Sequence, residues 1–198
     1  YFKCTTVSYL YFDYVDKIID FTTTYNSPKC DSISFISDLI YIYLWGINSI
    51  TGPITNLNSN ITKFSIAGIS NIISLPTLPN TLQNLILYGN NETISTLPTL
   101  PVNLLDLTVM GKNTIHTIPT LPPTLITLQI YGYNTINTLP TLPSTLISLS
   151  IIGYNTINDM PTLSSNIQNV YIGGNNSIGY NIANIPDNIR VIQLFSNG

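Results

Sequence analysis

A repeat of 21 or 22 residues fills most of this chain and restricts its possible folds more than any other feature. Residues 139–157 read Leu-Pro-Thr-Leu-Pro-Ser-Thr-Leu-Ile-Ser-Leu-Ser-Ile-Ile-Gly-Tyr-Asn-Thr-Ile, and related segments lie on both sides of them. The apolar residue that leads the strand of each repeat occurs at Leu39, Ile61, Leu82, Leu104, Leu125, Leu146, Ile167 and Ile189. Such regular spacing predicts a solenoid in which each repeat forms one turn and stacks on the turn before it.

Each repeat contains a short segment in which apolar and polar residues alternate, as at Leu149 and Ile151. Alternation is typical of a β-strand with one buried face, and strands of successive turns would lie parallel at about 4.8 Å. A glycine then ends the strand, where the backbone must turn sharply or adopt a positive φ. These glycines are Gly46, Gly68, Gly89, Gly111, Gly132, Gly153 and Gly174.

An asparagine follows two residues after the turn glycine in every repeat except one, which has Ser70. A buried amide is costly unless it is hydrogen-bonded. We therefore predict that these side chains form a ladder that bonds backbone groups of the same and the next turn. The predicted ladder consists of Asn48, Asn91, Asn113, Asn134, Asn155 and Asn176.

The Leu-Pro-x-Leu-Pro segment leads from one turn to the next. Its prolines exclude a helix and favour an extended, polyproline II-like path, while its two leucines are predicted to close the core. The L-P-x-L-P-x-x-L-x-x-L-x-I portion resembles leucine-rich repeats of the short type found in secreted bacterial effectors. The strand-Gly-x-Asn-x-Ile portion is similar to the FNIP repeats of amoebae and their giant viruses. The resemblance covers about four-fifths of the chain.

This resemblance implies a mainly β, right-handed leucine-rich-repeat solenoid with a parallel concave sheet and an extended convex side. It also implies that the concave sheet or its flanks bind macromolecules. We expect the repeats to span residues 39–198 and residues 1–38 to form an N-terminal cap with a degenerate first turn, because a solenoid end would otherwise expose core.

Cys4 and Cys30 are the only cysteines, and both lie in the predicted cap. Two such cysteines fit a disulfide in an exported protein, and two free thiols are the alternative. The chain begins at Tyr1 without an initiator Met, which indicates a mature form after removal of a signal peptide, or a fragment. The expected location is extracellular or at the cell surface.

Charged residues make up only 8% of the chain, and the net charge is −3. The six Lys and Arg residues are scattered, which argues against nucleic acid as a partner. No apolar segment approaches the roughly 20 residues that span a bilayer, so we expect no membrane insertion. A packed protein with a polar but weakly ionic surface is the prediction.

Strand residues that alternate with the buried ones should face the concave side. Exposed aromatic residues on a rigid sheet are typical interface anchors. The predicted interface consists of Tyr41, Tyr43, Trp45, Tyr88, Met110, Tyr131, Tyr171 and Phe195. The alternative for the first three is burial beneath the N-terminal cap. A protein partner, self or other, is expected, with a glycan as the alternative.

Asparagine triplets and rows of threonine are candidate sites of glycosylation, with a purely structural role as the alternative. Asn-x-Ser/Thr triplets begin at Asn60, Asn91 and Asn175, and Asn175 and Asn60 are the candidates for glycosylation. Three rows of threonines follow the outer side, for which backbone bonding, O-glycosylation and the binding of ordered water are the alternatives. The first row is Thr77, Thr99, Thr120, Thr141 and Thr162.

Titratable residues of the repeats show no catalytic pattern. The acids Glu92, Asp106, Asp159 and Asp187 occupy different turns, and His116 has no acid or Cys beside it in the pattern. General acid–base catalysis needs such groups positioned together. We expect no enzyme activity, no cofactor and no metal site.

Three functions remain. The first is a self-assembling extracellular structural protein, such as a filament, coat or wall subunit, joined through the solenoid ends and faces. The second is a recognition or adhesion module whose concave aromatic face binds a protein or glycan. The third is a secreted effector that holds a host protein and keeps its cysteines reduced.

Overall fold

The computed structural model describes residues 2–4, 11–13, 18–22, 29–34, 41–50, 54–55, 57, 59–70, 75–90, 94–157, 159–174 and 185–196. Within these residues the regular secondary structure consists of strands alone. None of the described segments forms a helix long and apolar enough to cross a membrane.

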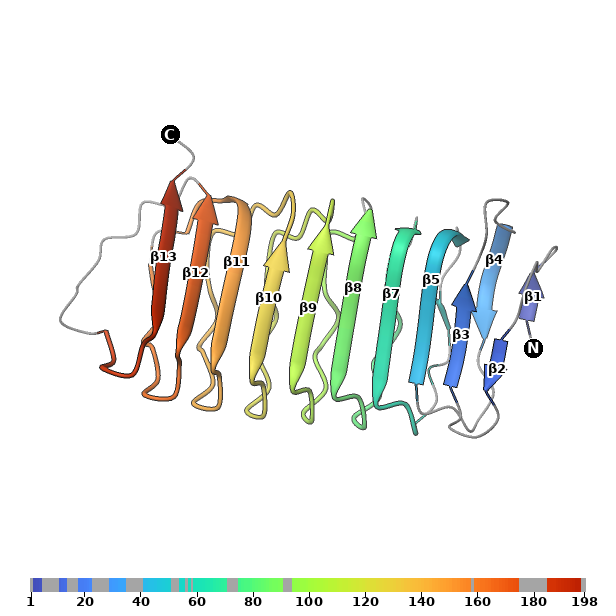
Figure 1. The fold of residues 1–198 in the computed structure, drawn as a ribbon, viewed down its shortest axis with the longest axis horizontal. Coiled ribbons are helices and arrows are strands. Elements are labelled where there is room, and N and C mark those ends of the chain that lie inside the picture. Colours follow the sequence, from blue (N-terminus) through green and yellow to red (C-terminus); the bar gives the residue numbers. More distant parts are fainter. Residues whose placement is uncertain are drawn as a thin grey trace.

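Parallel strands from successive turns form one sheet, and they lie side by side in Figure 1. The strands of this sheet, in spatial order, are β3 (Ile18–Thr22), β5 (Tyr41–Ile50), β7 (Lys63–Ser70), β8 (Asn84–Asn90), β9 (Asp106–Gly111), β10 (Thr127–Tyr131), β11 (Ser148–Asn155), β12 (Asn169–Gly174) and β13 (Val191–Ser196). The chain therefore returns to the same sheet once in every turn.

The register of the sheet follows the sequence repeat. Leu85 lies opposite Leu107, Leu107 opposite Leu128, and Leu128 opposite Leu149. This alignment confirms the predicted architecture: a mainly β solenoid of leucine-rich-repeat type with a parallel sheet.

The core runs along the inner side of the sheet as rows of aliphatic residues. On β10, Leu128 and Ile130 are fully buried, whereas Thr127 and Gln129 on the other face are half-buried. Burying one such aliphatic side chain contributes about 1.5–3 kcal/mol. Because equivalent residues repeat in every turn, the core is continuous through the described turns.

The segment that leads from one strand to the next lies across the core from the sheet. Along this segment, a buried residue recurs every three positions. Ile115, Ile118 and Leu121 are buried, whereas Thr117 and Thr120, directly before two of them, are exposed. A period of three residues is that of polyproline II. The extended path predicted from the prolines is therefore confirmed.

The N-terminal strands pair differently. The strand β2 (Tyr11–Asp13) runs antiparallel to β3, and β3 runs parallel to β5 with Ile18 opposite Tyr41. The parallel sheet thus begins one turn before the Leu39 repeat. The division into a cap over residues 1–38 and repeats over residues 39–198 remains a prediction.

A second set of pairings involves β1 (Phe2–Cys4), β4 (Lys29–Ser34) and β6 (Ile54–Thr55). The strand β1 is antiparallel to β4, and β4 is parallel to the end of β5 and to β6. The strands β1 and β4 lie at the N-terminal end of the solenoid in Figure 1.

Candidate interaction surface

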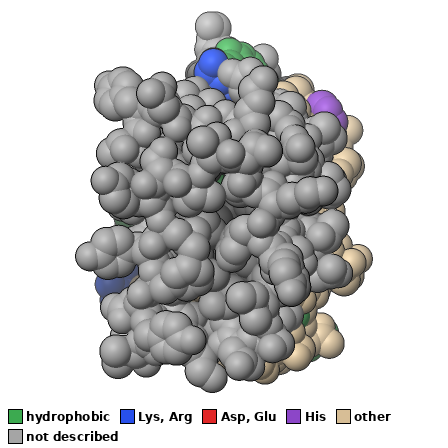
Figure 2. Space-filling view, turned by 90° about the vertical axis from the view of Figure 1, so that its right-hand side faces the viewer, with side chains coloured by type: hydrophobic (Ala, Val, Ile, Leu, Met, Phe, Trp, Pro, Cys, Tyr) green, Lys and Arg blue, Asp and Glu red, His purple; other side chains and the backbone are tan. Residues whose placement is uncertain are grey.

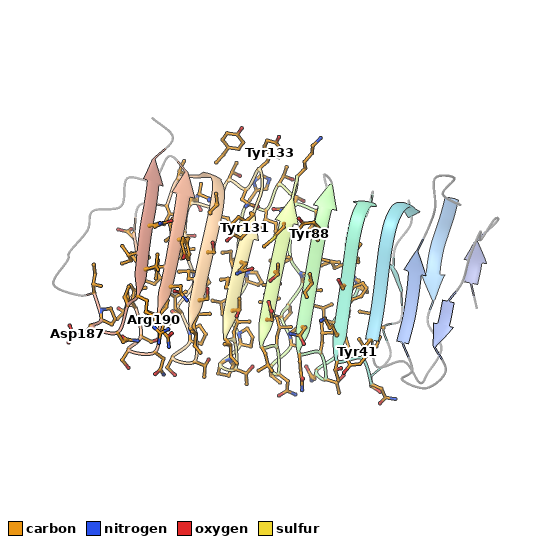
Figure 3. All side chains as sticks on the ribbon, viewed as in Figure 1. Tyr41, Tyr88, Tyr131, Tyr133, Asp187 and Arg190 are labelled. Atoms are coloured by element: carbon orange, nitrogen blue, oxygen red, sulfur yellow. The ribbon has the colours of Figure 1, made fainter. Side chains whose placement is uncertain are left out.

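The face of the sheet that points away from the core, called the open face here, carries a column of large apolar side chains. Tyr88 lies opposite Met110 across β8 and β9, and Tyr131 lies opposite Ile152 across β10 and β11. Tyr88 is 55% exposed, and the other three are half-buried. Figure 3 shows Tyr88 and Tyr131 on strands of the same sheet. We call these four residues the apolar column.

The neighbouring column of the open face is polar except for Ile86 in the described turns from β7 to β13. The Ser150 hydroxyl donates to the Tyr131 phenol oxygen at 2.6 Å, and Ser150 is only 1% exposed. The Thr108 hydroxyl donates to Asp106 Oδ1 at 2.9 Å. The hydrogen bond from Ser150 fixes the far end of the Tyr131 side chain, so the apolar column includes an aromatic ring with restricted freedom.

The members of the predicted interface whose side chains are described lie at several positions of the sheet. Of this set, Tyr88, Met110 and Tyr131 belong to the apolar column, whereas Tyr41 and Tyr171 are half-buried at other positions of the sheet. Figure 3 shows Tyr41 near the N-terminal end of its strand, away from Tyr88. The side chains of Tyr43, Trp45 and Phe195 lie outside the described residues, so their predicted roles, including burial beneath a cap, stay predictions.

Buried asparagines connect neighbouring turns at the carboxyl ends of the strands. The Nδ2 groups of Asn113, Asn134 and Asn155 donate to backbone oxygens of the next turn, those of Tyr131 at 2.7 Å, Ile152 at 3.3 Å and Gly173 at 3.0 Å respectively. All three asparagines are 0% exposed. The side chains of Asn48, Asn91 and Asn176 lie outside the described residues.

The glycine before each ladder asparagine allows the turns to approach closely. Gly132 has φ of 147°, and a Cβ built there would lie 2.1 Å from the Gly111 carbonyl oxygen. A Cβ at Gly153 would lie 2.7 Å from the Gly132 carbonyl oxygen. A side chain at these positions would separate the backbones that the asparagines join.

A second connecting row, at the amino ends of the strands, was missed in the sequence. Thr145 Oγ1 contacts the Pro123 and Leu125 oxygens of the preceding turn at 2.7 and 2.8 Å. Equivalent side chains that donate to a preceding turn are Thr81, Asn103, Thr124, Asn166 and Asn188. We call this set the tie row. Its signal was present, because a Thr or Asn directly precedes the apolar residue that leads each of these strands.

An exposed aromatic pair was also missed. The rings of Tyr133 and Tyr154 stack with centroids 5.6 Å apart and planes 17° apart. They are 47% and 52% exposed, and Figure 3 shows Tyr133 beyond the carboxyl end of the sheet. The repeated Gly-Tyr-Asn triplets at these positions could have revealed the pair.

The first threonine row, whose members are given above, is exposed in every turn. Figure 2 views the N-terminal end, and neutral polar side chains and backbone form most of the described surface at its right-hand edge. Asn60 is exposed, and Asn91 and Asn175 lie outside the described residues. Glycosylation at Asn60 or Asn175 therefore stays a prediction.

Titratable groups are dispersed over the described surface. His116 Nδ1 contacts Thr135 Oγ1, and Asp159 and Asp187 are exposed in different turns. Among the described residues, no three His, Cys, Asp or Glu side chains gather in a way that could hold a metal ion. The apolar column, with large apolar side chains aligned on adjacent strands, is the candidate functional surface.

Comparison with known proteins adds little to this picture. No protein-family model matches the chain, and no curated protein matches it. Among solved structures, the chain is similar to YopM from Yersinia enterocolitica WA-314, with 19% sequence identity, a TM-score of 0.29, and coverage of 84% of this chain and 53% of that chain. The chain thus spans about half the length of that protein. Because the TM-score is low, the repeat-like fold rests on the register and the burial pattern.

Proposed function

We propose that this chain is a non-enzymatic binding module that holds a protein partner on its open face. The observation that carries the proposal is the apolar column of Tyr88, Met110, Tyr131 and Ile152 on adjacent strands. Aromatic residues and methionine are enriched at protein interfaces, and tyrosines are frequent among the residues that dominate binding energy.

The sheet beneath this column favours binding because it is already ordered. The strands that carry it are hydrogen-bonded to neighbours on both sides. The bond from Ser150 to Tyr131 also restricts the tyrosine before a partner arrives. Association then loses less conformational entropy than it would on a mobile loop.

The surroundings of the column indicate the chemistry of the partner. Gln129 and Tyr171 are half-buried neutral neighbours on the same face. The hydroxyls of Thr108 and Ser150 are buried and already bonded to Asp106 and Tyr131. A partner surface with apolar side chains flanked by neutral polar groups complements this face. Affinity should depend weakly on salt, because little charge is involved.

Peptides selected from a displayed random library test the proposal. Replacing Tyr88 with Ala, or Met110 with Ala, should lower the affinity for the selected peptides about tenfold or more, because a central contact is lost. Tyr133→Ala is the matched control, because this tyrosine is similarly exposed but lies off the open face. Binding that depends on Tyr133 and not on Tyr88 would show that the open face has been wrongly assigned.

A glycan array probed with the same variants distinguishes a glycan ligand from a protein ligand. If Tyr88→Ala abolishes glycan binding and no selected peptide depends on Tyr88, the ligand of the open face is a carbohydrate and not a protein. Stacking of sugar rings on tyrosine is the contact such a result would indicate.

Self-assembly into an extracellular structure is the remaining candidate from the sequence, and it stays a prediction. Its support is the low charge of the chain, which weakens repulsion between copies. Analytical ultracentrifugation over a wide concentration range decides it: large reversible species favour assembly, and a monomer throughout argues for the binding module. We also propose that the repeat belongs to the short bacterial type or to the FNIP type. The support for this assignment is the pattern of motif residues in the sequence.

A further inference from the structure

The two cysteines of the chain occupy directly opposite positions in the N-terminal strands. The strands β1 and β4 are antiparallel, and Cys4 is the Cα partner of Cys30, with a register shift between this pair and the pair of Phe2 with Ile33. The same Cys30 is the Cα partner of Ile50 on β5 across its other edge. The residues lie far apart in the sequence, so only this pairing brings them together.

The register of this pair suits a disulfide. Opposite residues of an antiparallel pair have Cα atoms about 4.5 or 5.5 Å apart, depending on the type of position. Natural disulfides usually join Cα atoms about 4.4–6.8 Å apart. Both types of position fall inside that range, and the pairing of Cys4 with Cys30 therefore favours a bond even though the ladder is irregular between Phe2 and Cys4.

We propose that Cys4 and Cys30 form a disulfide that acts as a clasp on the N-terminal end of the solenoid. The bond joins β1 to β4 and closes a covalent loop that contains β2 and β3. Because β4 also pairs with β5, the clasp connects the first strand of the chain to the long strands of the sheet. This inference does not depend on the proposed binding face.

The chemistry balances by exchange with a disulfide oxidant such as glutathione disulfide. One cysteine thiolate attacks the oxidant and releases one glutathione thiolate, leaving a mixed disulfide. The second cysteine thiolate attacks the protein sulfur of that mixed disulfide and releases a second glutathione thiolate. Two protein thiols are oxidised, and one glutathione disulfide is reduced to two glutathiones.

The clasp has a structural consequence at the edge of the parallel sheet. The strand β2 covers the outer edge of β3, with Phe12 opposite Ile19. Uncovered strand edges are templates for pairing with another chain. Residues 14–17 already join β2 to β3, so the disulfide acts on the N-terminal segment as a whole. With β1 tied to β4, β2 has fewer ways to leave β3, which disfavours edge-to-edge association of two copies.

Mass spectrometry of the full chain tests the bond. After equilibration in a glutathione redox buffer, the oxidised protein should be lighter by two hydrogens, and a non-reducing digest should contain the peptide pair that joins Cys4 to Cys30. The matched control is Cys30→Ser with Ser34→Cys, because the pairing of Phe2 with Ile33 places residue 34 at the opposite end of β1 from Cys4. Free thiols in the wild type, or equal bridging in the control, would overturn the proposal.

Stability and association test the role of the clasp. The melting temperature of the oxidised wild type should exceed that of the reduced protein by about 5–15 °C. Cys4→Ser/Cys30→Ser should melt like the reduced wild type and should sediment as larger species at high concentration. Equal melting temperatures, or a monomeric double variant, would overturn the role of the disulfide in keeping the edge closed. Circular dichroism of the double variant distinguishes loss of the clasp from failure to fold.

Discussion

The two ends of the parallel strands are joined to neighbouring turns by side chains that differ in burial and direction. At the carboxyl ends, Asn113, Asn134 and Asn155 are inaccessible and donate to the following turn. At the amino ends, Thr81 and Thr145 are exposed and donate to the preceding turn. Each turn is therefore connected by side chains in both directions along the solenoid.

This difference determines how much each connection should contribute. At the amino ends water can replace the bond to an exposed partner such as Pro123, whereas the second partner, such as Leu125, is buried. At the carboxyl ends the asparagine side chains themselves are inaccessible to water. A buried group left without a partner costs about 1–3 kcal/mol, whereas a typical hydrogen bond contributes about 0.5–1.5 kcal/mol net. The carboxyl ends should therefore dominate stability, and mutations at the two ends can test that claim.

The largest effect is expected for Gly132→Ala. The residue has φ of 147°, and its added Cβ would lie 2.1 Å from the Gly111 carbonyl oxygen. Strain and the forced separation of two backbones should lower the free energy of unfolding by about 3 kcal/mol or more. Urea unfolding measures the change, with Tyr133→Ala as the exposed control. Equal stability of the two variants would contradict close stacking of the turns.

A smaller loss is expected for Asn155→Ala, followed by Asn134→Ala. Asn155 donates to the Gly173 oxygen, and its Oδ1 accepts a hydrogen bond from the Ile136 amide at 3.3 Å. Asn134 Oδ1 has no partner in the described part of the chain. Asn155→Ala should therefore cost about 2–3 kcal/mol and Asn134→Ala about 1–2 kcal/mol. The reverse order in urea unfolding would count against the ladder bonds as described.

A smaller effect is expected in the tie row, and the smallest in the first threonine row. Thr145→Val removes the hydroxyl of an exposed residue that bonds one oxygen on exposed Pro123 and one on fully buried Leu125, so the loss should be about 1 kcal/mol. Thr141→Val lies in the exposed first threonine row and should change stability by less than about 0.5 kcal/mol. A loss of stability at Thr145 as large as that at Asn155 would contradict the claim that the buried connections at the carboxyl ends contribute more to stability than those at the amino ends.

The repeat allowed the central part of this fold to be predicted from the sequence. The step of 21 or 22 residues determines which residues lie opposite one another, as with Leu107 and Leu128. The alternation of residues determines which face of each strand enters the core. Both properties depend on local spacing, which is visible in a single chain.

The candidate surface was only partly predictable, because the spacing of residues in the repeat does not determine the conformations of side chains. Ser150 occupies the open face yet is almost fully buried, with its hydroxyl bonded to the Tyr131 phenol. The tie row was missed because threonine and asparagine alternate irregularly within it, so no single residue type marks it. The antiparallel pairing of β1 with β4 joins segments outside the repeat, where the sequence has no periodic signal.

Pulsed electron paramagnetic resonance on spin-labelled pairs tests the stacking of turns most directly. In a background with Cys4→Ser and Cys30→Ser, labels on the open face at Gln193 and Ile86 are separated by five strand steps, and labels at Gln193 and Ser65 by six. At about 4.8 Å per step, the backbone separations should be about 24 and 29 Å. Distances that increase by one strand spacing per repeat would support the solenoid. A shorter distance for the Ser65 pair than for the Ile86 pair would contradict it.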